Sequence, residues 1–157
     1  MEKIQILVMD VDGTLTDSKI YTSANGELMK AFNVKDGYAI VHFLPELNIV
    51  PMIITGRSSD ILLARCKELK ITEVYQGVSN KIDKLKEICE QKNITFSQVA
   101  YIGDDLNDLE CMKVCGFKGC PVDAASEVVS VCDFVCTKKG GDGAVREFIE
   151  YIKNNIN

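Results

Sequence analysis

Short apolar runs rich in β-branched residues alternate along this chain with segments whose apolar side chains recur every three or four positions. The first kind of run is typical of buried strands and the second of helices, so the alternation predicts βαβ units. Such units build a parallel sheet that helices cover on its faces. The sequence therefore predicts an α/β fold with a Rossmann-like parallel sheet flanked by helices. We expect strands near residues 4–9, 49–55, 74–76, 99–102, 117–120 and 134–136, and helices near residues 62–69, 82–89, 109–112 and 143–153.

One segment interrupts the first connection between strands. Residues 19–32 read KIYTSANGELMKAF, two extended arms on either side of Asn25-Gly26. An Asn-Gly dipeptide between such arms favours a tight hairpin turn, so we expect a β-hairpin flap over about residues 18–33. The chain of 157 residues is close to the usual size of one domain and holds no repeat or linker. We therefore expect residues 1–157 to form a single domain.

The charge balance argues against some classes of partner. The chain has 18 lysines and arginines against 23 aspartates and glutamates, a net charge of −5, which does not suit binding to nucleic acid or to an anionic membrane. No apolar run reaches the roughly 18 residues of a membrane span, and the first residues lack the plan of a signal peptide. The seven cysteines include no Cys-x-x-Cys pair. We expect a cytoplasmic chain with reduced, buried cysteines and neither a nucleic-acid nor a membrane partner.

Carboxylates follow two of the expected strands. Asp10 and Asp12 end the first, and their spacing of two projects them to the same side. Asp104 and Asp108 follow the run at 99–102 and share one face if a helix begins there. Ligands of parallel α/β sheets bind beyond the carboxyl ends of the strands, where four crowded carboxylates would repel one another without a cation. An all-oxygen set suits Mg²⁺, so we expect a magnesium site; the alternative is that these aspartates are helix caps and solvated turn residues.

Two further strand ends carry groups suited to a phosphate. Thr55 and Gly56 offer a hydroxyl and free backbone amides at a helix start, although a Thr-Gly pair is also a common helix cap. Lys81 stands at the start of the next helix and is either a surface charge or the counter-ion of the aspartates. Together with the aspartates, these groups favour phosphoryl transfer through an aspartyl-phosphate.

This chemistry gives each residue a role. Asp10 would attack phosphorus, while Mg²⁺ and Lys81 offset the charge on the transferred oxygens. Asp12 would protonate the leaving oxygen and then act as base for the water that hydrolyses the intermediate. The residues expected to bind the phosphate are Thr14, Thr55, Gly56 and Lys81.

The same residues carry a resemblance to a known family. The segments DVDGT at 10–14 and GDDLND at 103–108, with Thr55 and Lys81 between them, resemble the four motifs of the haloacid dehalogenase superfamily of phosphatases in the family's order. The resemblance implies the nucleophile and acid/base assigned above. It also implies that the metal ligands are the side chains of Asp10 and Asp104 and the backbone carbonyl of Asp12, with Asp108 acting through water or on Lys81, and it leaves Asp105 without an assigned role.

A closer resemblance is to the capless branch of this family that dephosphorylates 3-deoxy-D-manno-octulosonate 8-phosphate (KDO 8-phosphate). The segments that carry it are KAFNVKDGYAI, IITGRSS, VYQGVSNK, AYIGDDLND and GGDGAVRE. It implies a Mg²⁺-dependent phosphomonoesterase of lipopolysaccharide biosynthesis, with no cap domain and with this sugar-acid phosphate as its substrate. It also implies a homotetramer in which the hairpin and the glycine segment at 140–143 of adjoining subunits roof the active site; a plain loop is the alternative for the glycine segment.

Two residues bear on the substrate. Arg57, after Thr-Gly, resembles the KDO type and would pair with an anionic substrate, whereas a sister branch acting on nine-carbon, sialic-acid-type 9-phosphates tends to carry glutamate there. An exposed arginine at a helix start is the alternative. Ser18 stands where family members often carry glycine. The other functions that we weigh are a phosphatase for such nine-carbon 9-phosphates and a non-catalytic, phospho-accepting or regulatory domain linked to a sugar nucleotidyltransferase.

Overall fold

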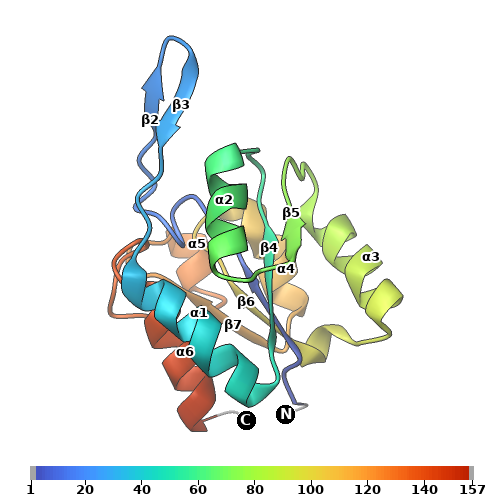
Figure 1. The fold of residues 1–157 in the computed structure, drawn as a ribbon. Coiled ribbons are helices and arrows are strands. Elements are labelled where there is room, and N and C mark those ends of the chain that lie inside the picture. The colour runs from blue at the N-terminus through green and yellow to red at the C-terminus, as the bar shows by residue number, and fades with distance from the viewer. Residues whose placement is uncertain (1–2, 156–157) are drawn as a thin grey trace.

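The computed structural model describes residues 3–155 and is built around one six-stranded sheet (Figure 1). Every pair of neighbouring strands in this sheet is parallel, which confirms the predicted α/β fold. Across the sheet the strands follow the order β5 (Glu73–Tyr75), β4 (Val50–Ile54), β1 (Ile6–Met9), β6 (Val99–Ile102), β7 (Phe117–Cys120) and β8 (Phe134–Val135).

Helices pack on both faces of the sheet. One face is covered by α1 (Val34–Leu47), α2 (Asp60–Glu68) and α6 (Ala144–Asn155), and the other by α3 (Lys81–Lys92), α4 (Leu109–Val114) and α5 (Ser126–Val129). Two 3₁₀ turns, η1 (Phe96–Gln98) and η2 (Leu106–Asp108), flank β6.

The central strand shows why its sequence is apolar throughout. Leu7 and Met9 of β1 lie in the core under α1, α2 and α6, while Ile6 and Val8 lie in the core under α3, α4 and α5. Both faces of the strand are sheltered from water, as a parallel sheet with helices on both sides requires. The continuous run of apolar residues is therefore typical of a strand that is buried on both faces.

The predicted hairpin is present between β1 and α1. Its strands, β2 (Tyr21–Ser23) and β3 (Gly26–Met29), pair antiparallel and project beyond the rest of the described chain (Figure 1). The prediction of a turn at Asn25-Gly26 is wrong by one residue, because Ala24 and Asn25 form the turn. Gly26 instead opens β3 opposite Ser23 with a φ of 114°, a conformation that glycine adopts without strain.

Ser18 marks the start of this hairpin with an unusual backbone. Its φ is 70°, in the left-handed region that favours glycine. A glycine, which the resemblance leads us to expect at this position, would adopt this conformation without strain.

Most of the cysteines lie in the core, as the sequence predicts. All seven cysteines are unpaired, and all but Cys132 are buried. Within residues 3–155, none of the helices combines the length and the apolar character needed to cross a membrane.

The carboxyl ends of three central strands lie level with one another. Met9 of β1 pairs with Ile53 of β4 on one side and with Ile102 of β6 on the other. The residues that follow these strands therefore meet at one edge of the sheet, which is where the sequence places its polar motifs.

Candidate active site

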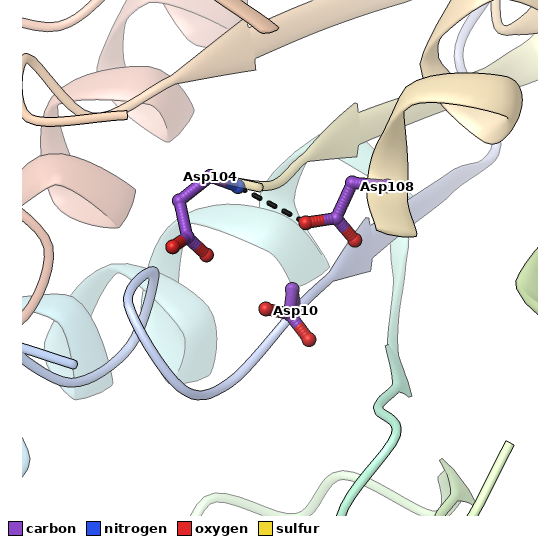
Figure 2. A group of neighbouring side chains, drawn as sticks. All are labelled: Asp10, Asp104 and Asp108. Carbon is purple, nitrogen blue, oxygen red and sulfur yellow. Dashed lines mark hydrogen bonds between the residues drawn. The ribbon is translucent and has the colours of Figure 1, made fainter. Parts of the chain in front are cut away.

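Three aspartates converge at this edge. Asp10 directly follows β1, Asp104 lies two residues after β6, and Asp108 ends η2. One carboxylate oxygen of each lies within 4.8 Å of the others, and Figure 2 shows the three side chains around a common centre. The structure thus brings together three of the four carboxylates that the sequence selects as a group.

Asp108 is held differently from its neighbours. The helix expected at Asp104 does not begin there, since η2 precedes α4, and this turn buries Asp108 completely. Its Oδ1 accepts hydrogen bonds from Lys81 Nζ at 2.7 Å and from the Tyr101 hydroxyl at 2.8 Å. Its Oδ2 accepts from the backbone N–H groups of Asp104 and Asp105 at 3.1 and 3.3 Å. With both oxygens occupied, Asp108 serves to hold Lys81 and the 104–105 turn in place.

Lys81 joins two of the carboxylates. Its Nζ donates to Asp10 Oδ1 at 2.7 Å as well as to Asp108, and its side chain is almost fully buried. Burial alone would lower the pKa of Lys81, but the charges of Asp10 and Asp108 outweigh this effect and raise it. The lysine is therefore a buried ammonium group and not the surface charge that was the alternative.

The cluster still carries an excess of negative charge. Burial, and then the charge of Asp108, raise the pKa of Asp10, although Lys81 opposes them. Burial, and then the charge of Asp10, raise the pKa of Asp104. Both shifts mean that these carboxylates are costly to ionise side by side, and a divalent cation between them would remove that cost.

The carboxylate of Asp104 packs closely against the loop that follows β1. The Thr14 hydroxyl donates to its Oδ1 at 2.9 Å, and a Cβ on Gly13 would lie only 2.0 Å from its Oδ2. Glycine at position 13 is therefore required for the carboxylate to lie against the loop that follows β1. The structure places Thr14 behind Asp104 and not in direct contact with the expected phosphate site. Its hydroxyl donates to Asp104, and its N–H donates to the Val11 carbonyl.

The donor set fits a hard divalent cation. Asp10 and Asp104 each keep oxygen capacity beyond the bonds described, and the cluster contains neither a histidine nor a cysteine. Oxygen ligands of this kind suit Mg²⁺. The cluster of Asp10, Asp104 and Asp108 could therefore hold a metal ion.

A small pocket adjoins Asp10. It encloses about 130 Å³, and its walls are formed by Asp10, Asp12, Thr55, Gly56, Arg57, Asp105 and Asn107. The structure thus gathers most of the predicted catalytic and phosphate-binding residues around one hollow. The side chain of Arg57 is half-exposed, and its Nε lies 3.9 Å from Asp12 Oδ2.

The glycine segment packs against the site from within the same chain. Gly141 N–H donates to the Thr14 carbonyl at 3.2 Å, and a Cβ on Gly140 would lie 1.9 Å from the Gly13 carbonyl oxygen. Gly141 has a φ of 73°, which favours glycine. The segment is therefore a close-packed support for the loop after β1, which is more than the plain loop that was one alternative.

Comparison with known proteins agrees with this geometry. A family model of haloacid dehalogenase-like hydrolases matches residues 60–149. The chain belongs to this family. The 3-deoxy-D-manno-octulosonate 8-phosphate phosphatase KdsC of Escherichia coli K12 is 42% identical over 151 residues, which cover 96% of this chain and 80% of that enzyme.

Solved structures of hydrolases with that activity have the same fold. The phosphatase from Moraxella catarrhalis, in complex with magnesium, phosphate and KDO, superposes with a TM-score of 0.91 at 40% identity, covering 97% of this chain and 88% of that one. The cobalt-bound phosphatase from Haemophilus influenzae superposes with a TM-score of 0.90 at 36% identity, covering 96% and 87%.

Three residues of this hydrolase were missed by the sequence reasoning. Tyr101 bonds Asp108, Asn107 lines the pocket, and Lys30 of the hairpin bonds Asp12 Oδ1 at 2.5 Å. Asn107 stands next to Asp108, inside a segment already singled out, so its position was a usable signal. Tyr101 and Lys30 also lie in segments that carry the family resemblance, AYIGDDLND and KAFNVKDGYAI, but nothing in their residue type or spacing indicates contact with Asp108 or Asp12.

Proposed function

We propose that this protein is a Mg²⁺-dependent phosphomonoesterase that hydrolyses KDO 8-phosphate to the free sugar acid and inorganic phosphate. The observation that carries the proposal is the buried Asp10, bonded to Lys81 at 2.7 Å beside Asp104 and open to a small pocket. Relatives 36–42% identical over nearly the whole chain act on this substrate by name, and one of their structures holds magnesium, phosphate and KDO.

The reaction follows from the positions of the carboxylates. Asp10 attacks phosphorus, and the bond from phosphorus to the sugar oxygen breaks as Asp12 gives that oxygen a proton. Water then attacks phosphorus while Asp12 takes its proton, and the bond from phosphorus to Asp10 breaks. Both aspartates are thereby returned to their starting states, and one phosphate is released.

The other residues hold charge and position. We assign the binding of Mg²⁺ to the side chains of Asp10 and Asp104 and the backbone carbonyl of Asp12, and the ion would neutralise charge on the phosphate oxygens. Lys81 also offsets charge beside Asp10, and Asp108 holds it in that position. Thr55 and the amide of Gly56, at the end of β4, are placed to bind the transferred phosphate.

Arg57 is the residue that we assign to the substrate's carboxylate. Its side chain is 50% exposed, and it is the cationic group among the residues that line the pocket. A guanidinium binds a carboxylate through two hydrogen bonds in one plane, which suits recognition of a sugar acid.

The test compares two substrates in one assay. Purified protein with Mg²⁺ is given KDO 8-phosphate or a nine-carbon sialic-acid-type 9-phosphate, and phosphate release is measured with and without a chelator. We expect kcat/KM to favour the eight-carbon substrate by about tenfold or more, equivalent to ~1.4 kcal/mol. Activity should vanish in chelator, return with added Mg²⁺, and be absent in Asp10→Asn.

Other outcomes would change the function. A preference for the nine-carbon substrate would indicate that the protein is a phosphatase of sialic-acid-type 9-phosphates. A long-lived phosphoprotein without phosphate release would indicate a phospho-accepting domain, and full turnover in excess chelator would contradict the role of the metal.

We further propose that residues 1–157 act as one domain and that the protein is a cytoplasmic homotetramer. The hairpin exposes apolar side chains, with Leu28 at 62% and Met29 at 50%. An isolated two-stranded hairpin is marginal in water, so contact with another subunit would stabilise it. Light scattering tests this proposal, and an active monomer would contradict it.

A further inference from the structure

Lys30 lies at the base of the hairpin, one residue after β3. Although the hairpin projects into solvent (Figure 1), the side chain of Lys30 is only 5% exposed. Its Nζ lies 2.5 Å from Asp12 Oδ1 and 3.0 Å from Glu27 Oε1. A flexible hairpin lysine is thus held between two carboxylates, one of them the proposed acid/base.

The second carboxylate is anchored in turn. Glu27 Oε2 accepts a hydrogen bond from the hydroxyl of Ser59, and the same hydroxyl oxygen accepts from Leu62 N–H to cap α2. The hydrogen bond from Ser59, and then Lys30, hold the pKa of Glu27 below its usual range. A continuous series of polar contacts therefore connects Ser59 at the start of α2, through Glu27 and Lys30, to Asp12.

The two oxygens of Asp12 have different surroundings. Oδ1 is taken by Lys30, whereas Oδ2 lies on the side of Arg57, 3.9 Å from its Nε. Asp12 and Arg57 both line the pocket beside Asp10. Among the hydrogen bonds of residues 3–155 none reaches Oδ2, whose ion pair with Arg57 is long at 3.9 Å, so Oδ2 is the oxygen available to a substrate.

We propose that Lys30 is a positioning residue, which fixes the carboxylate of Asp12 so that Oδ2 faces the leaving-group oxygen. This inference rests on the proposed phosphatase function and adds to it a role for the hairpin within its own subunit. In the first step the proton passes from Asp12 Oδ2 to the leaving oxygen as the phosphorus–oxygen bond breaks. In the second step Oδ2 takes a proton from the attacking water, and Lys30 neither gains nor loses one.

The test uses leaving groups that differ in their need for a proton. An aryl phosphate such as para-nitrophenyl phosphate leaves as a stable phenolate, whereas a sugar alcohol needs protonation. The rate of leaving-group release is measured by rapid quench in a single turnover with Mg²⁺, for both substrates. The quantity of interest is the ratio of the sugar-acid phosphate rate to the aryl phosphate rate.

We expect Lys30→Met to lower this ratio by about tenfold or more, because an unfixed acid slows only the reaction that needs it. Lys30→Arg, which keeps the charge, should restore most of the ratio. The matched control is Lys19→Met, since Lys19 belongs to the same hairpin segment, is 73% exposed and pairs only with Asp17 among the ion pairs found in residues 3–155. It should leave the ratio unchanged.

Some results would contradict the positioning role of Lys30. If Lys30→Met slows both substrates equally, or neither, Lys30 does not position Asp12. If that variant does not fold, Glu27→Gln decides, since it keeps Lys30 but weakens its second anchor and should lower the same ratio by about threefold. Failure of the proposed function looks different, because the unmodified protein would then release phosphate from neither substrate, or Asp10→Asn would be as active.

Discussion

Two lysines in this molecule each join two carboxylates, but they stand in different structures. Lys81 bridges Asp10 and Asp108 at the start of a helix packed on the sheet, and its side chain is 2% exposed. Lys30 bridges Asp12 and Glu27 at the base of a projecting hairpin, and its two partners are 19% and 18% exposed. The first pair of carboxylates is almost fully buried, with Asp10 7% and Asp108 0% exposed, whereas the second pair keeps more access to water.

Because of this difference in burial, the two lysines contribute differently to stability and to activity. A buried charge that loses its partner cannot be solvated, so the sheet-edge lysine supports both the fold and the reaction. Carboxylates with access to water can be solvated when their lysine is removed, so the hairpin lysine supports the reaction with little effect on the fold. A third buried carboxylate, Asp36, has no lysine partner among residues 3–155 and is the third case to compare.

Removal of Lys81 should have the largest effect. Lys81→Met leaves Asp10 and Asp108 without their common cation, so we expect the free energy of unfolding in chelator to fall by about 3 kcal/mol. Turnover should fall by about a thousandfold or more, because charge on the transferred oxygens is no longer offset. Chemical denaturation and phosphate release measure the two effects. Lys86→Met, on the exposed side of the same helix, is the control, and an equal loss there would contradict the assignment.

The next effect concerns Asp36 and depends on pH. Asp36 is buried, accepts the backbone N–H of Arg146 at 2.8 Å through Oδ1, and leaves Oδ2 without a hydrogen-bond partner among the described residues. Burial raises its pKa from 3.8 to about 6. The folded state therefore keeps a proton that the unfolded state loses between about pH 4 and pH 6, and stability falls as pH rises through this window.

Asp36→Asn removes that dependence. The amide keeps an acceptor for Arg146 N–H and cannot ionise, so the variant should be more stable than the unmodified protein by about 2 kcal/mol at pH 7, with little difference at pH 3. Denaturation at a series of pH values measures this. A difference between the two proteins that does not change with pH would show that Asp36 ionises without cost.

Tyr101→Phe should have a smaller effect. It removes one of the four hydrogen bonds to Asp108 and leaves Lys81 and the two backbone donors. We expect a loss of about 1–2 kcal/mol in the free energy of unfolding. Tyr75→Phe, which removes a hydroxyl bonded to the partly exposed Glu73, is the control and should change stability by less than about 0.5 kcal/mol. Equal losses in the two variants would contradict a special role for Tyr101.

The smallest effect on stability should come from the hairpin lysine. Lys30→Met is expected to change the free energy of unfolding by about 1 kcal/mol or less, because Asp12 and Glu27 reach solvent. Lys30→Met and Lys81→Met are measured in the same denaturation series, so that their losses in the free energy of unfolding can be compared directly. A loss as large as that of Lys81→Met would mean that the hairpin is part of the stable core.

The sequence predicted the parts of this molecule that depend on local pattern. Periodicity predicted the sheet, the Asn-Gly pair between two extended arms predicted the hairpin, and parallel strand ends share an edge, so Asp10 and Asp104 could be grouped from the sequence alone. The turn was misplaced by one residue because Gly26 is needed just after it, where φ is positive. The contacts of Thr14 with Asp104 and of Lys30 with Asp12 were beyond reach, since they depend on how loops distant in sequence fold over one another.

The packing of the glycine segment against the loop after β1 has a consequence for synthesis of the chain. Gly140 and Gly141, which brace the backbone that follows Asp10, are made more than a hundred residues after it. A ribosome-bound chain that lacks this brace has its proposed nucleophile, Asp10, next to an unsupported loop. Competence for chemistry therefore has to wait until the glycine segment has been made and has packed against the loop after β1.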